Sequence, residues 1–145
     1  MAAFIFVLTI ASGAFLLFQV QPIISKYILP WFGGTSAVWI TAMLFFQVFL
    51  LFGYAYIFFL GRFSLKKQIV IHLILVSSIT FLIVWLFSLW QAPILPDMSW
   101  KLSDDFSPIV QVLGVLFMSV GLPYFLLSTT SIVLQKWYSD THEGK

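Results

Sequence analysis

The sequence has very few charged residues and no cysteine. Only 8% of its 145 residues are charged, as seven Lys or Arg and five Asp or Glu, whereas about 25% is usual in soluble domains. So few charges cannot cover the water-facing surface of a globular protein. Because 61% of the residues are hydrophobic, we expect lipid to surround most of the chain, and the lipid bilayer is the first predicted partner.

These absences also exclude several kinds of site. Without cysteine there are no disulfides and no thiolate metal sites, and the redox compartment cannot be inferred. His72 and His142 lie far apart with no carboxylate at ligand spacing, so we expect no metal and no cofactor. The cations are too few and too dispersed for a nucleic-acid footprint. We therefore expect no nucleic-acid partner.

The chain instead contains long apolar runs. Four of them reach the length of about 20 residues that a helix needs to cross a bilayer, and none alternates strictly as a barrel strand would. The sequence therefore predicts an all-α protein, an integral membrane bundle of four transmembrane helices. Residues 1–145 form a single transmembrane domain, with helices expected at about 2–21, 37–60, 69–90 and 108–134.

The first run is uncharged and ends at Gln21-Pro22. The alternative to a retained helix is a cleaved secretory signal. No basic residue precedes the run, the apolar stretch is too long, and no small-x-small cleavage site follows. We therefore predict a retained transmembrane helix.

Residues 26–34 form a short apolar connector. Pro30 and the glycine pair at its end should break the helix, while Tyr27 and Trp31 suit the level of the lipid headgroups. This pattern favours an interfacial turn, with a re-entrant dip as the alternative. Thr35 or Ser36 can then cap the second helix.

The distribution of cations predicts the orientation of the chain. Short loops on the cytoplasmic side carry an excess of Lys and Arg. With the N-terminus inside, the inner side holds Arg62, Lys66, Lys67, Lys136 and Lys145. The outer side holds Lys26 and Lys101. We therefore expect a multi-pass protein of the cell (inner) membrane with both termini in the cytoplasm.

The expected spans contain no Asp, Glu, Lys or Arg, which are the usual markers of an ion or proton path. His72 is the only ionisable candidate, one turn from the start of the third helix, and we interpret it as an interfacial histidine rather than a proton relay. The remaining polar candidates are the glutamines Gln19, Gln21, Gln47 and Gln111. Their amides can hydrogen-bond between helices. Helix packing is the favoured role, and a substrate path is the alternative.

Small and polar residues also recur at helical spacing. In the first helix, one face holds Thr9, Ser12, Leu16 and Gln19. In the fourth helix, a heptad-like stripe holds Gln111, Gly114, Met118, Gly121, Phe125 and Ser128. Small residues allow helix backbones to approach closely, so both faces are predicted to be packing surfaces. Pro123 should kink the fourth helix near Ser119 because it removes a backbone donor.

Several sequence blocks together form a family pattern. The first block, residues 12–22, ends in Gln21-Pro22, and the second, residues 26–39, contains Pro30-Trp31-Phe32-Gly33-Gly34. The third, residues 43–56, contains Phe45-Phe46-Gln47 and Gly53-Tyr54-Ala55-Tyr56. The fourth, residues 121–130, begins with Gly121-Leu122-Pro123-Tyr124-Phe125. The chain resembles the bacterial spermidine-synthase-like membrane proteins, in which a transporter-like membrane half is joined to an aminopropyltransferase-like domain. The resemblance covers nearly the whole chain and is weakest in the third helix.

The resemblance implies an incomplete set of family parts. Family members continue into further helices and a Rossmann-like synthase domain. That domain holds a decarboxylated S-adenosylmethionine-type cosubstrate on a glycine-rich loop and deprotonates the amine with acidic residues. This sequence has neither the loop nor the carboxylate pair, so no catalytic residue is carried over. The chain is expected to be the N-terminal part of a larger membrane domain, truncated or separately encoded.

Three functional hypotheses follow. The first is a non-catalytic membrane module that anchors or partners a synthase-like domain, or binds further transmembrane helices. The second is a transporter or transporter half for polyamines or another small solute, although a polycation path would ordinarily need carboxylates. The third, a membrane-embedded enzyme, would need a nucleophile, metal cluster or acid–base pair at membrane depth, and the sequence offers none.

Overall fold

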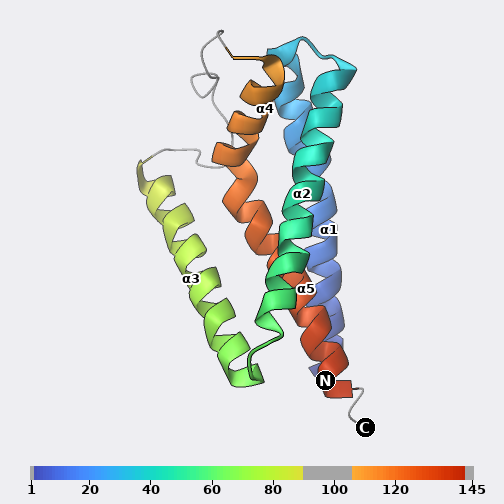
Figure 1. Ribbon diagram of the computed structural model, residues 1–145, viewed down its shortest axis with the longest axis vertical. Helices are drawn as coiled ribbons and strands as arrows, with labels where there is room; N and C mark the ends of the chain where they lie inside the picture. Colours follow the sequence, from blue (N-terminus) through green and yellow to red (C-terminus); the bar gives the residue numbers. More distant parts are fainter. Residues whose placement is uncertain (1, 90–105, 143–145) are drawn as a thin grey trace.

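The computed structural model describes residues 2–89 and 106–142 (Figure 1). Every regular element in these ranges is helical. In chain order they are α1 (Ala2–Ile28), the 3-10 turn η1 (Leu29–Phe32), α2 (Ser36–Leu60), α3 (Leu65–Leu89), α4 (Pro108–Leu116), the π-helical segment η3 (Phe117–Gly121) and α5 (Leu122–His142). The expected end of the third helix at Trp90, the polar loop that follows and Lys101 lie outside the described residues.

The described helices include four that are long and apolar enough to cross a membrane. The fourth of these runs through α4, η3 and α5 as one rod (Figure 1). The prediction of an all-α bundle of four membrane-spanning helices is therefore confirmed. The start of α1, the turn between α2 and α3, and the end of α5 all lie at one end of the bundle (Figure 1).

The first helix is longer than predicted. It was expected to end at Gln21-Pro22, but α1 continues through Pro22 to Ile28 and includes Lys26. Proline costs the helix one backbone hydrogen bond, whereas ending the helix there would leave several backbone groups without partners. In an apolar surrounding the second cost is larger, so the helix continues.

The connector after α1 is short. The α-helix ends at Ile28, two residues before Pro30, which lies in the 3-10 turn η1. Gly33 and Gly34 then end this turn, with φ of 78° and 66°. Only glycine adopts this left-handed region freely. The amide of Gly34 donates to the carbonyl of Leu29 at 3.0 Å, which closes the turn. The helix then restarts at Ser36 with Thr35 at the N-cap, although without a side-chain capping bond.

The third helix begins earlier than predicted. It was expected from residue 69, but α3 starts at Leu65, so Lys66 and Lys67 belong to its first turn and not to a basic loop. Two bonds explain the early start. The amide of Gln68 donates to the carbonyl of Ser64 at 3.0 Å, and its side chain donates to the carbonyl of Phe63 at 2.8 Å.

The fourth span begins as predicted and ends later. Ser107 caps α4 through its hydroxyl, which accepts from the amide of Val110 at 3.5 Å, and Pro108 is the first helical residue. The helix was expected to end at residue 134 but reaches His142. Lys136 and Asp140, one turn apart, form a salt bridge of 2.7 Å in the added turns.

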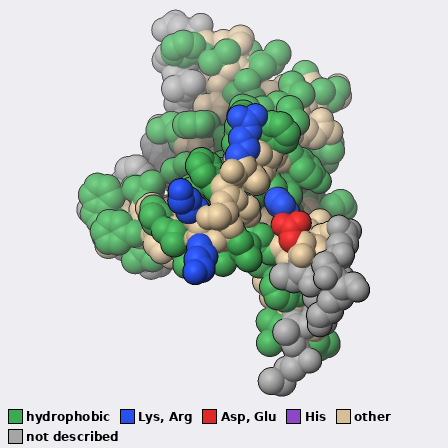
Figure 2. Space-filling view, turned by 60° about the horizontal axis from the view of Figure 1, so that its bottom comes forward, with side chains coloured by type: hydrophobic (Ala, Val, Ile, Leu, Met, Phe, Trp, Pro, Cys, Tyr) green, Lys and Arg blue, Asp and Glu red, His purple; other side chains and the backbone are tan. Residues whose placement is uncertain are grey.

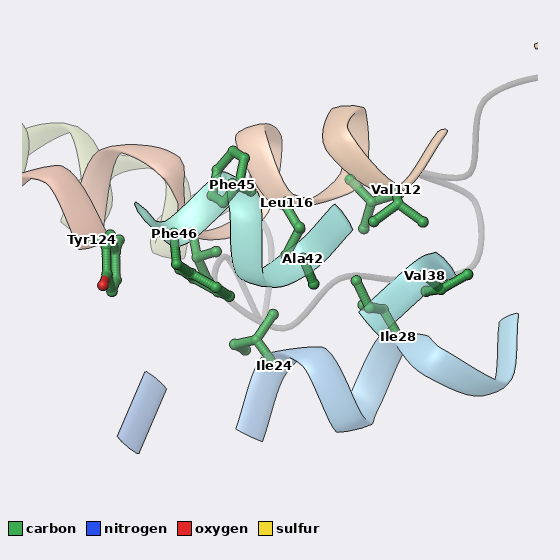
Figure 3. Packing of buried hydrophobic residues seen from close by; sticks show 11 residues of the cluster. Ile24, Ile28, Val38, Ala42, Phe45, Phe46, Val112, Leu116 and Tyr124 are labelled. Atoms are coloured by element: carbon green, nitrogen blue, oxygen red, sulfur yellow. The ribbon is translucent and has the colours of Figure 1, made fainter. Parts of the chain in front are cut away.

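The main hydrophobic core lies between α1, α2 and the fourth span, toward the end where α1 turns into α2 (Figure 3). Its buried members are Ile24, Ile28, Val38, Ala42, Phe45, Phe46, Val112, Val115, Leu116, Val120 and Tyr124. A smaller cluster at the opposite end joins Ile57, Leu60 and Val133. The third span, α3, lies outside the main core and diverges from its neighbours along its length (Figure 1).

Candidate functional site

The hydroxyl of Tyr124, on α5, is a buried polar group of the core that bonds to another span. The side chain is 2% exposed, and its hydroxyl accepts a hydrogen bond from Nε2 of Gln21 on α1 at 2.7 Å. Its ring packs on Phe46 of α2, with centroids 4.8 Å apart (Figure 3). Tyr124 therefore joins three spans at one point, and Gln21 supplies the hydrogen bond between α1 and α5.

Tyr124 is the third residue after the π-helical segment η3, which ends at Gly121. Pro123 has no amide hydrogen and its ring crowds the carbonyl of Ser119, four residues earlier. The helix widens into the π-helical segment over Phe117–Gly121, which includes Ser119, and the predicted kink at this position stays a prediction. The hydroxyl of Ser119 is buried and donates to the carbonyl of Val115 at 2.7 Å.

The other predicted glutamines do not meet at a common site. Gln111 is 4% exposed, and its amide nitrogen donates to the carbonyl of Phe106 at 2.8 Å, close to the start of α4. Gln19 is half-buried, and Gln47 is exposed on the outer surface of α2. A shared polar path through the four side chains is therefore not formed by the described residues.

The predicted stripe of the fourth span is only partly a packing surface. Gly121 and Ser128 are buried, but Met118 is 62% exposed. The π-helical segment lies between the two halves of the stripe and inserts an extra residue into the helical repeat. The seven-residue spacing therefore does not keep one face, and Val115, which lies off the stripe, is fully buried.

The buried members of the stripe do face another helix. A Cβ atom added to Gly121 would lie 3.4 Å from the ring of Phe49 on α2. Ser128 approaches Gly53 of α2, where an added Cβ would lie 2.8 Å from the serine hydroxyl oxygen. Small residues here allow α2 and α5 to lie close together, as helix interfaces in membranes require.

The predicted polar face of the first helix does not pack in the same way. Thr9, Ser12 and Leu16 are exposed, and the hydroxyl of Thr9 donates to the carbonyl of Ile5 in its own helix. The face that packs includes Gly13 instead, which lies against Ser131 of α5. A neutral polar group in a helix can satisfy itself locally, so polarity alone did not identify the contact face.

A second polar cluster lies at the end of the bundle where α3 begins, and the sequence analysis did not predict it. The indole Nε1 of Trp137 on α5 donates to Oε1 of Gln68 on α3 at 3.0 Å. His72 follows one turn later and is 5% exposed, with its ring edge-on to Trp137 and its Nδ1 3.4 Å from the hydroxyl of Tyr56 on α2. We call Tyr56, Gln68, His72 and Trp137 the end cluster.

The end cluster changes the interpretation of His72. It was expected at the interface, one turn into the third helix, but α3 begins earlier and the ring is buried between α2 and α5. Among residues 2–89 and 106–142, its Nε2 has no hydrogen-bond partner. Only the pairing of Trp137 with Gln68, far apart in sequence, brings these side chains together, and no spacing rule could have found them.

The described residues contain no group of three or more His, Asp or Glu side chains that could hold a metal ion. Comparisons of the chain with protein-family models, with curated proteins and with solved structures find no match. The features of the molecule that bear on function are therefore the junction at Tyr124, the end cluster and the surface of the bundle.

Proposed function

We propose that this chain is a non-catalytic integral membrane module of the spermidine-synthase-like kind, which anchors or partners a synthase-like domain or binds further transmembrane helices. The observation that carries the proposal is the junction at Tyr124. Three of the sequence blocks that resemble the family supply its parts: Gln21, Phe46 and Tyr124 itself. The blocks thus have a shared structural role, which is to hold three spans together.

The chemistry of the junction also supports a scaffold rather than a reaction centre. An amide, a phenol and a phenyl ring include no nucleophile paired with a base. The buried hydroxyls of Ser119, Ser128 and Thr129 all donate to carbonyls of their own helix. These groups satisfy backbone carbonyls near the π-helical segment, which is a structural role.

The proposed orientation places both termini in the cytoplasm of the cell. Lys66 and Lys67 lie in the first turn of α3, Arg62 lies just before it, and Lys136 lies toward the end of α5. These segments share one end of the bundle, whereas the last turn of α1, which holds Lys26, lies near the opposite end (Figure 1). Figure 2 shows Lys and Arg side chains on the first of these ends. The positive-inside rule assigns the cation-rich end to the cytoplasm. A synthase-like partner would then meet the module at this end.

Reconstitution tests the proposal. The purified chain in liposomes is mixed with a soluble synthase-like domain from the same genome, and both retention of the domain and turnover of putrescine are measured. We expect retention of the domain with the liposomes and no aminopropyl transfer by the chain alone. Turnover by the chain alone, or no retention above that of protein-free liposomes, would contradict the proposal.

A second candidate function is transport of a polyamine or another small solute, and η3 is the observation that favours it. Helices interrupted within the membrane form binding sites in transporters, and η3 lies within the fourth span. Uptake of labelled putrescine into proteoliposomes tests this function. Gln111→Leu should lower uptake and the exposed Gln47→Leu should not; equal uptake by protein-free liposomes and the intact chain would exclude it.

A further inference from the structure

A shallow, open surface groove runs along one face of α3 from its first turn. Its first hollow, of about 350 Å³, is lined by Phe63, Lys66, Lys67, Val70 and Ile71. A second hollow, of about 310 Å³, is lined by Val70, Leu73, Ile74, Ser77 and Ser78. The two hollows share Val70 and follow the three- and four-residue spacing of one helix face. We call them together the α3 groove.

Within the part of the chain that the structure describes, no acidic side chain pairs with the two lysines at the head of the α3 groove. Within the described ranges, Lys136 is paired with Asp140 at 2.7 Å, and the guanidinium of Arg62 lies over the rings of Phe58 and Phe59 at 5.3 and 5.2 Å. The same ranges contain no salt bridge to Lys66 or Lys67. Figure 2 shows Lys and Arg side chains gathered on this end of the molecule, with little acidic surface beside them.

The position of the two lysines makes this charge more unfavourable. They stand in the first turn of α3, which contains no acidic residue. The N-terminus of a helix carries a partial positive charge and favours acidic side chains or bound anions. Two ammonium groups at this position repel the helix dipole and each other. An anion bound between them would relieve both effects.

The rest of the α3 groove fits a hydrocarbon chain. Val70, Leu73 and Ile74 are exposed and apolar, and they extend away from the lysines along the helix axis. From Lys66 to Ser77 the helix rises by about 17 Å, at about 1.5 Å per residue. One leaflet of the hydrocarbon core is about 15 Å thick. The groove therefore has cations at the headgroup level and an apolar length that matches one leaflet.

We propose that the α3 groove is a binding site for an anionic phospholipid, with its phosphate between Lys66 and Lys67 and an acyl chain along Val70, Leu73 and Ile74. Basic pockets at the cytoplasmic side of membrane helices bind anionic headgroups, and here the groove also accepts the chain. The site does not depend on the proposed function or on a partner domain. A bound lipid would link the start of α3 to the leaflet and reinforce the end cluster one turn away.

Native mass spectrometry of the whole chain in detergent tests this site, with phosphatidylglycerol and phosphatidylcholine as probes. We expect the intact chain to prefer phosphatidylglycerol. Replacing both lysines, as Lys66→Gln with Lys67→Gln, should weaken its binding by about fivefold per lysine. The matched control Lys26→Gln removes a cation near the other end of the bundle and should leave the preference unchanged. Unchanged binding in the double variant, or an equal loss in Lys26→Gln, would overturn the site.

Two further experiments complete the test. The first distinguishes a lipid phosphate from soluble phosphate, and the second tests whether the groove binds the acyl chain. Inorganic phosphate at millimolar concentration should not displace the lipid; displacement would identify a site for soluble phosphate and overturn the lipid assignment. Ile74→Trp fills the groove and should weaken phosphatidylglycerol binding with both lysines present, whereas Val84→Trp, further along α3 and outside the groove, should not. Equal binding of phosphatidylglycerol by the two tryptophan variants would contradict the proposal that the acyl chain lies along the α3 groove. Circular dichroism confirms that each variant is folded.

Discussion

At the scale of single residues, close contacts between spans depend on glycine and serine. Gly13 of α1 lies against Ser131 of α5, and Gly53 of α2 lies against Ser128 of the same helix. The fourth span therefore packs against two partners through adjacent turns of small residues. Lipid is as apolar as leucine, so close packing and hydrogen bonds, rather than hydrophobic burial, hold such helices together.

This arrangement predicts different effects for neighbouring substitutions on α1. Gly13→Leu introduces a side chain where even a Cβ meets Ser131, and overpacking of this kind costs about 1–3 kcal/mol. Ala14→Leu places the same side chain at an exposed position and should be nearly neutral. Thermal unfolding of both variants in detergent measures the difference. Equal melting temperatures would mean that α1 and α5 do not pack through Gly13.

The junction at Tyr124 gives a second prediction at this scale. Tyr124→Ala leaves a cavity among α1, α2 and α5 and should cost about 3–5 kcal/mol, as large aromatic truncations do. Tyr124→Phe removes only the bond to Gln21 and should cost about 0.6 kcal/mol. Tyr54→Phe, on an exposed ring, is the matched control. A loss in Tyr124→Phe as large as in Tyr124→Ala would show that the hydroxyl has a role beyond this bond.

At the scale of elements, α3 differs from the other three spans. It lies outside the main core, and its side chains Ile74, Phe81, Val84 and Trp85 are exposed. Its described polar contacts with the bundle are those of the end cluster, near its first turns. We therefore expect α3 to be attached at one end and to pack more loosely along the rest of its length.

Removing the polar attachment should loosen α3 selectively. Trp137→Phe keeps an aromatic ring beside His72 but removes the indole donor to Gln68. Hydrogen exchange of α3 amides should accelerate, while exchange in α2 stays unchanged, because local opening follows the weakest contacts. Trp39→Phe, on the exposed surface of α2, serves as the control. Uniform acceleration in every span would indicate general destabilisation instead.

At the scale of the whole molecule, four spans bring the start of α1 and the end of α5 to the same end of the bundle (Figure 1). Arg62, Lys66, Lys67 and Lys136 also lie at this end, and Lys26 lies near the other. Any even number of membrane crossings puts the two ends of the chain on the same side of the membrane. The charge difference then selects which end stays in the cytoplasm.

Reporter fusions check this topology directly. A reporter after Lys67 should be active on the cytoplasmic side, and a reporter after Asp104 on the opposite side, because α3 separates the two positions. The chain has no cysteine, so single introduced cysteines offer an independent labelling test at the same sites. The same side for both positions would contradict the four-span arrangement, and an inverted pair would contradict the proposed orientation.

The sequence alone determined the class of the fold and the number of spans. Runs of apolar residues of membrane-crossing length identify helices because backbone groups in lipid have no partners except within the segment. The same rule explains the error at Pro22. The end of the first helix was placed there by preferences measured in water, whereas in an apolar surrounding the helix continues past this proline.

Only the tertiary structure decided which polar residues meet. Gln21 was predicted as a packing residue, but its partner Tyr124 lies 103 positions away, and nothing in the local pattern distinguishes it from the exposed Tyr54. Gln68, His72 and Trp137 are brought together in the same way. The face of a membrane helix that packs is set by the shape of its neighbours, because lipid and protein are equally apolar and the sequence carries little contrast between them.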